Sequence, residues 1–69
     1  MKISARNILK GKVVKVTRGA VNAEVVLELP GKIQVVSIIT LSSVDSMGIK
    51  EGKEAYAVVK ASSVMIAVD

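Results

Sequence analysis

The sequence predicts an all-β domain, and three observations lead to that fold class. Val and Ile together make up 20 of the 69 residues, and β-branched side chains favour strands. These residues gather in runs separated by turn-forming residues, as in short strands joined by tight turns. The chain is also 51% hydrophobic and 23% charged, which is apolar enough for a folded protein. We therefore expect one domain that spans residues 1–69.

The first two strands are predicted from their alternation. The first is expected at Leu9–Thr17, where two lysines share a face with two valines, and a bulge near Gly11–Val14 explains this irregularity. Arg18-Gly19-Ala20 is expected to form a turn. The second strand then shows the cleanest alternation in the chain, so one face should be core and the other wet. Its core face comprises Ala23, Val25, Leu27 and Leu29.

A hairpin is expected next, because Pro30-Gly31 is a strong turn dipeptide. The following strand, Ile33–Thr40, should pair antiparallel with the second. Apolar side chains occupy both of its faces, since Val36 and Ile38 point away from Val35. A monomer of this size does not easily cover both faces, so a neighbouring subunit is the expected cover.

The order of the remaining elements predicts the architecture. Ser42 is the expected N-cap of a short helix that stops at Gly48. A fourth strand is expected at Glu54–Ala61 and a fifth at Met65–Val68. A small five-stranded OB-type barrel, with one short helix between strands 3 and 4, has this order of elements.

Size and composition favour self-association and exclude several chemistries. A domain of this length buries only roughly 60% of its unfolded surface. The chain contains neither Cys nor His, which removes disulfides, thiolate and imidazole metal sites, and the commonest nucleophiles and bases. No carboxylate cluster resembles a calcium loop. We expect no enzyme activity, no catalytic cofactor and no metal-cation site, and association with further copies as the reinforcement.

Location and partners follow from the absence of long apolar runs and from charge. No apolar run approaches the ~18 residues of a membrane span, and Met1–Arg6 lacks a signal-peptide core. A cytoplasmic protein without a membrane partner is expected. The net charge of +4 favours anionic partners. Binding to single-stranded nucleic acid is disfavoured because Tyr56 is the only aromatic residue for base stacking, although a nucleic-acid-binding OB module stays as an alternative.

Two short segments at opposite ends of the chain gather cationic and hydroxyl donors. They are Ser4-Ala5-Arg6-Asn7 and Lys60-Ala61-Ser62-Ser63. A tetrahedral dianion accepts hydrogen bonds and donates none, so it needs positive charge and donors without a carboxylate nearby. Neither segment adjoins Asp or Glu. Taken singly, Arg6 and Lys60 are ordinary surface cations, and only the coincidence of donor types at both ends favours an oxyanion site.

Six stretches in order carry a resemblance to a known family. They are Ile3-Ser4-Ala5-Arg6-Asn7, Leu9-Lys10-Gly11-Lys12-Val13, Asn22-Ala23-Glu24-Val25, Ser37-Ile38-Ile39-Thr40, Gly48-Ile49-Lys50-Glu51-Gly52 and Val59-Lys60-Ala61-Ser62. On these stretches the chain resembles the molbindins, or Mop proteins, small molybdate- and tungstate-binding proteins with a TOBE/Mop-type OB domain. The resemblance implies a homohexamer, built as a trimer of dimers, that holds molybdate or tungstate at subunit interfaces for intracellular storage or homeostasis.

The resemblance also implies site residues. One oxyanion site would comprise Ser4, Ala5, Arg6, Lys60, Ala61 and Ser62, with Thr40 from a neighbouring subunit. A second, weaker site would use backbone N–H groups of Gly19, Ala20, Val21 and Asn22, for which a plain turn is the simpler interpretation. A structural oligomer with incidental anion binding is a further alternative.

Overall fold

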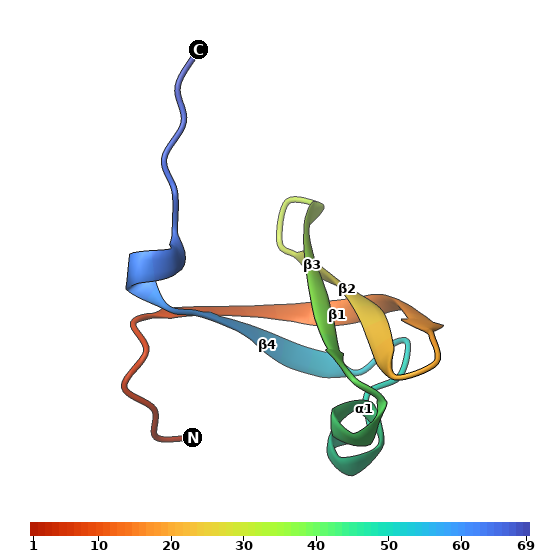
Figure 1. The fold of residues 1–69 in the computed structure, drawn as a ribbon. Coiled ribbons are helices and arrows are strands. Elements are labelled where there is room, and N and C mark those ends of the chain that lie inside the picture. The colour runs from red at the N-terminus through yellow and green to blue at the C-terminus, as the bar shows by residue number, and fades with distance from the viewer.

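One antiparallel sheet dominates the computed structural model, which describes residues 1–69 (Figure 1). Its strands are β1 (Asn7–Arg18), β2 (Asn22–Leu29), β3 (Ile33–Thr40) and β4 (Glu54–Val59). They lie in the order β3-β2-β1-β4, so β3 and β4 are the edges. A helix of seven residues, α1 (Leu41–Met47), follows β3, and no helix of the chain is long enough to cross a bilayer.

The long first strand curls the sheet. Its first half pairs with β4 and its second half with β2, and the register shifts between Val13 and Lys15, which confirms the predicted bulge. Close to it, a Cβ on Gly11 would lie 2.5 Å from the Glu28 carbonyl oxygen, so only glycine fits this crossing. The bend in β1 gives an OB-like half-barrel in place of a flat sheet (Figure 1).

The predicted hairpin between the second and third strands is confirmed. β2 and β3 pair antiparallel from Asn22 opposite Thr40 to Leu29 opposite Ile33. At the connection, Gly31 and Lys32 have φ values of 84° and 62°, the left-handed conformation that glycine adopts at no steric cost. Turn chemistry that is local in sequence therefore fixes this register.

The predicted helix is present, but its N-cap lies two residues earlier than expected. Thr40, not Ser42, is the N-cap: its Oγ1 accepts a hydrogen bond from the Ser43 backbone N–H at 3.0 Å. Thr40 ends β3 in an extended conformation, which aims its side chain at the third N–H of the helix. The helix stops at Gly48 with a left-handed φ of 63°, as predicted.

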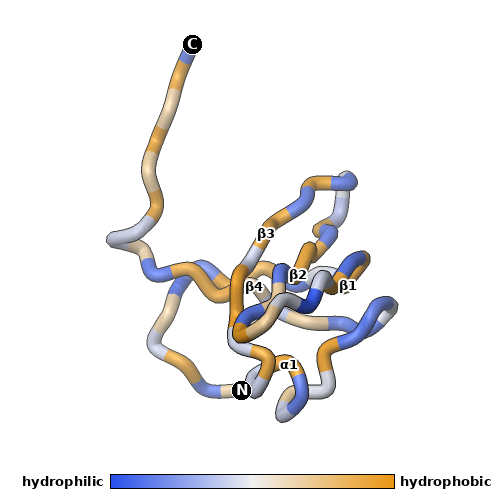
Figure 2. The backbone as a smooth tube through the Cα atoms, turned by 45° about the vertical axis from the view of Figure 1, so that its right-hand side comes forward, coloured by the Kyte–Doolittle hydropathy of each residue, from blue (hydrophilic) through white to orange (hydrophobic).

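The structure has four strands, and the prediction of a fifth at Met65–Val68 is wrong. The fourth strand ends at Val59 instead of Ala61, because Ala61–Ser63 form a 3-10 turn. This turn directs the chain away from the sheet, so the last residues find no strand to pair with (Figures 1 and 2). Met65, Ile66 and Val68 are 92%, 87% and 93% exposed.

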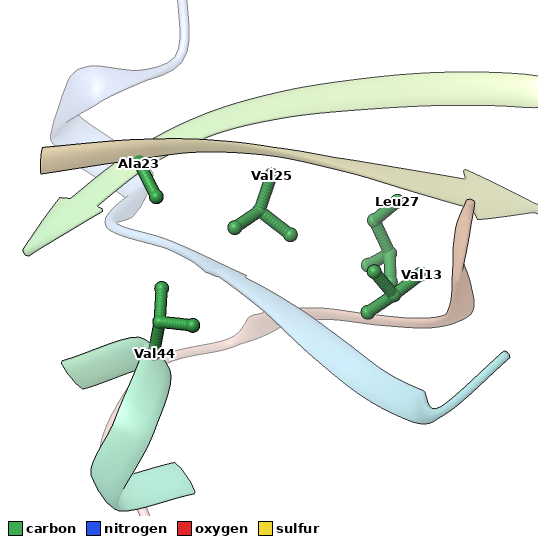
Figure 3. Packing of buried hydrophobic residues seen from close by; sticks show 5 residues of the cluster. All are labelled: Val13, Ala23, Val25, Leu27 and Val44. Carbon is green, nitrogen blue, oxygen red and sulfur yellow. The ribbon is translucent and has the colours of Figure 1, made fainter. Parts of the chain in front are cut away.

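The core is small. Only six of 69 residues are buried, and five of them form one cluster in which Val44 of α1 points towards the side chains of β2 (Figure 3). The cluster comprises Val13, Ala23, Val25, Leu27 and Val44. Three of the four predicted core residues of β2 are therefore buried, and Leu29 is partly buried against them. Val36 and Ile38 of β3 are 59% and 61% exposed, and their cover by a neighbouring subunit stays a prediction.

Candidate functional site

The pairing of β1 with β4 brings the two ends of the chain together. The outermost pair of this ladder is Asn7 opposite Val59. Arg6 immediately precedes Asn7 and Lys60 immediately follows Val59, so the antiparallel register sets the two cations at the same end of the sheet. Figure 1 shows both chain segments leaving the sheet there. Segments more than 50 residues apart in sequence thus become neighbours through one register.

A surface concavity of about 440 Å³ lies between these segments. Its lining residues are Ser4, Ala5, Arg6, Val58, Lys60 and Ala61. Five of these six were predicted from the sequence. Val58 was missed, although strand alternation puts it on the same face as Lys60, and it is 44% exposed. That shared face is the signal that identifies it.

The electrostatics of the concavity favour an anion. The structure contains two ion pairs, Lys10 with Glu54 and Arg18 with Asp45, and neither Arg6 nor Lys60 belongs to them. No carboxylate lines the concavity. Two neighbouring cations without a counter-charge repel each other. An anion that binds between them is attracted to both and outweighs this repulsion.

The donors around the concavity are those that an oxyanion needs. Arg6 offers a planar fork of N–H groups, Lys60 a compact ammonium and Ser4 a hydroxyl. Ser62 does not line the concavity itself but follows Ala61 in the 3-10 turn. The backbone hydrogen bonds of that turn are donated by the later N–H groups of Ser63 and Val64, because the first N–H groups of a helical turn have no partner within it.

Thr40 is not brought to this concavity within one chain. It lies at the end of β3 opposite Asn22, and its hydroxyl donates to Ser43 Oγ at 2.9 Å while accepting from the Ser43 N–H. Its side chain therefore already serves the helix cap. The contribution of Thr40 from a neighbouring subunit stays a prediction.

The segment predicted as a second site forms the turn between β1 and β2. The Gly19 N–H donates to the Asn22 carbonyl at 2.8 Å, and Gly19 does not adopt a positive φ. Arg18, the cation beside this turn, is paired with Asp45 at 3.2 Å. The Val21 carbonyl accepts from the Leu41 N–H. These contacts are those of a structural turn, and a second oxyanion site at Gly19, Ala20, Val21 and Asn22 stays a prediction.

Comparison with known families and proteins identifies close relatives over nearly the whole chain. A family model described as the TOBE domain matches residues 3–66. Molybdenum-pterin-binding protein 3 of Clostridium pasteurianum is 59% identical over 66 residues, which are 96% of this chain and 97% of that protein. Both comparisons cover the concavity and the sheet that forms it.

Two solved structures have the same fold. A molybdate-binding protein from Sporomusa ovata superposes with a TM-score of 0.92 at 32% identity, covering 99% of this chain and all of that one. The cytoplasmic molybdate-binding protein ModG, in a form with molybdate bound, superposes with a TM-score of 0.85 at 48% identity, covering 88% of this chain and 43% of that one. All of these relatives are described as binding proteins and none as an enzyme, in accordance with the predicted absence of catalysis.

Proposed function

This chain belongs to the molbindin, or Mop, family of TOBE domains, and on that premise we propose that it binds molybdate or tungstate in the concavity between Ser4–Arg6 and Lys60–Ser62. One observation carries the proposal. The β1–β4 register sets Arg6 beside Lys60 in a concavity without a carboxylate. Relatives that bind molybdate or molybdenum-pterin support the choice of ligand.

The chemistry of the ligand matches the donors. Arg6 binds two oxygens of the tetrahedral anion through its guanidinium fork, and Lys60 supplies a second charge. Together they neutralise the dianion, which lowers the cost of removing it from water. The hydroxyls of Ser4 and Ser62 complete the inner set, and Ala5 and Ala61 keep the site open because their side chains are small.

The biological role that fits is intracellular storage or homeostasis of the oxyanion in a cytoplasmic homo-oligomer. We propose a homohexamer, a trimer of dimers, in which Thr40 of a neighbouring subunit reaches the site. The small core and the exposed apolar face of β3 support association. A nucleic-acid-binding role has less support, because the single aromatic residue, Tyr56, is only half exposed and gives no platform for stacked bases.

The first prediction concerns ligand choice. Molybdate and tungstate raise the unfolding temperature of the protein, and phosphate does not. A ligand at 100 times its dissociation constant stabilises the folded form by about 2.7 kcal/mol. Phosphate carries a proton at neutral pH that needs an acceptor, and no carboxylate lines the concavity. Sulfate, which is also unprotonated, is the control for size selectivity.

Melting scans and calorimetry with the four anions check this prediction. A heat of binding for molybdate or tungstate, with no displacement by an equimolar amount of phosphate, is the expected result. Equal stabilisation by all four anions would leave a structural oligomer with incidental anion binding as the better description. No response to molybdate or tungstate would end the proposal.

A further inference from the structure

The wall that β4 gives to the anion concavity contains one branched apolar side chain. Val58 lines the concavity together with Lys60 and Ala61. It lies on the same strand face as Lys60, is 44% exposed and stands opposite Ile8 in the β1–β4 ladder. An anion held by Lys60 therefore meets a hydrocarbon surface beside that ammonium group.

This wall is also poor in hydrogen-bond acceptors. The Lys60 carbonyl accepts from the Ser63 N–H at 2.9 Å, and the Ala61 carbonyl accepts from the Val64 N–H at 3.3 Å. The Lys60 ammonium only donates. Among the side chains that line the concavity, the Ser4 hydroxyl is the one that can accept a hydrogen bond. The β4 wall thus combines donors with methyl groups.

We propose that Val58 is a specificity-determining residue, which favours tetrahedral dianions without a proton over those that carry one. This inference rests on the proposed function and assigns the class of anion that the same site accepts. The phosphate dianion has an O–H group. When that group faces the methyl groups of Val58, it loses its hydrogen bond to water and gains none, and an unmade hydrogen bond of this kind is costly.

An oxygen without a proton costs less in the same position. It has several lone pairs, so it still accepts from Arg6 and Lys60 when one side of it faces hydrocarbon. Turning the phosphate O–H towards Ser4 makes that hydroxyl an acceptor, and the anion then loses the hydrogen bond that Ser4 would donate. In both of these orientations phosphate makes one favourable contact fewer than sulfate, a dianion of similar size without a proton.

Val58→Asp tests the assignment, because it puts an acceptor that donates nothing into this wall. Above the second ionisation of phosphate, phosphate and sulfate are both dianions. Repulsion by the new carboxylate then weakens both alike and cancels in the ratio of their affinities. We expect the ratio of phosphate to sulfate affinity to rise at least tenfold, or about 1.4 kcal/mol. The measurement is the concentration of each anion that raises the unfolding temperature by the same amount.

Tyr56→Asp is the matched control. It adds the same charge on the same face of β4, two residues from Val58 and outside the concavity. Lys10 lies opposite Tyr56 in the ladder, so the strand tolerates a carboxylate there. The affinity ratio of this variant should stay within twofold of that of the unsubstituted protein, which also accounts for the general stabilisation that both salts give.

Val58→Asn carries an acceptor without a charge, and it keeps the test available if Val58→Asp does not fold. Its amide also donates, but equally to both anions, so the ratio should shift in the same direction. An unchanged ratio in the Val58 variants, or an equal shift in Tyr56→Asp, would overturn the role of Val58 and leave the proposed function intact. No stabilisation of the unsubstituted protein by molybdate or tungstate would instead overturn the proposed function, and this inference with it.

Discussion

Arg6 and Lys60 act through charge, because both side chains are exposed and lie outside the core cluster. Neither has a partner of opposite charge in the structure. Their removal therefore takes nothing from the packing and relieves a repulsion between cations. Ser4, which lines the same concavity, contributes a hydroxyl without charge and is expected to affect affinity less.

Arg6→Ala or Lys60→Ala is expected to weaken molybdate binding by about 10- to 100-fold each, since a hydrogen bond to a charged group contributes about 1.5–3 kcal/mol. Without ligand, the free energy of unfolding should stay within about 0.5 kcal/mol of the unsubstituted protein. Calorimetry and urea denaturation measure the two quantities. Lys50→Ala removes an exposed lysine outside the concavity and serves as the control for net charge. Unchanged binding in Lys60→Ala would show that the site lies elsewhere.

Gly11 is the residue that permits the close crossing of β1 over β2. Gly11→Ala is expected to destabilise the protein by about 1–3 kcal/mol, because the new Cβ would lie 2.5 Å from the Glu28 carbonyl oxygen and 3.0 Å from Leu27 Cγ. Urea denaturation measures the loss. Gly19→Ala, whose nearest contact is 3.1 Å, is the matched control and should lose less. Equal losses would mean that the crossing at Gly11 relaxes easily.

At the scale of secondary-structure elements, the limits of a strand are set by the strand or helix next to it. β1 begins and β4 ends at the pair of Asn7 with Val59, which sets Arg6 beside Lys60. β3 ends at Thr40 because the residue that completes the strand also caps α1. The helix is short, so its cap and the burial of Val44 hold it against the sheet.

The N-cap of α1 is Thr40, whereas the sequence pattern indicated Ser42. Thr40→Ala is expected to lower the free energy of unfolding by about 1 kcal/mol, because it leaves the Ser43 N–H without its acceptor. Ser42→Ala should be nearly neutral, since Ser42 is exposed and its side chain makes no hydrogen bond in the structure. Denaturation in the absence of oxyanion compares them. A larger loss for Ser42→Ala would restore Ser42 as the cap.

For the whole molecule, six buried residues form too small a core for a stable monomer. The exposed apolar residues Met65, Ile66 and Val68 add to this deficit. In the proposed oligomer these deficits disappear, so folding and association are expected to be coupled.

The unfolding temperature should therefore rise with protein concentration, by roughly 3–5 °C for each tenfold increase. Scanning calorimetry over a hundredfold range of concentration, without oxyanion, measures the slope. A slope of zero in the unsubstituted protein would show that the single chain is stable alone.

The sequence by itself determined the all-β class, the hairpin after Pro30-Gly31, the bulge in the first strand and most of the core face of β2. It also identified the two donor segments and predicted five of the six residues that line the concavity. These features depend on alternation, turn chemistry and donor type, which are properties of a residue and its near neighbours in the chain.

The tertiary structure alone decided which segments meet. The β1–β4 register joined Arg6 to Lys60 and added Val58 to the same wall. The tertiary structure also assigned the cap of α1 to Thr40 and left the predicted fifth strand at Met65–Val68 unpaired. The physical reason is that a strand forms only where an edge is free to accept its hydrogen bonds. That choice depends on contacts distant in sequence, which the local pattern of Met65–Val68 does not contain.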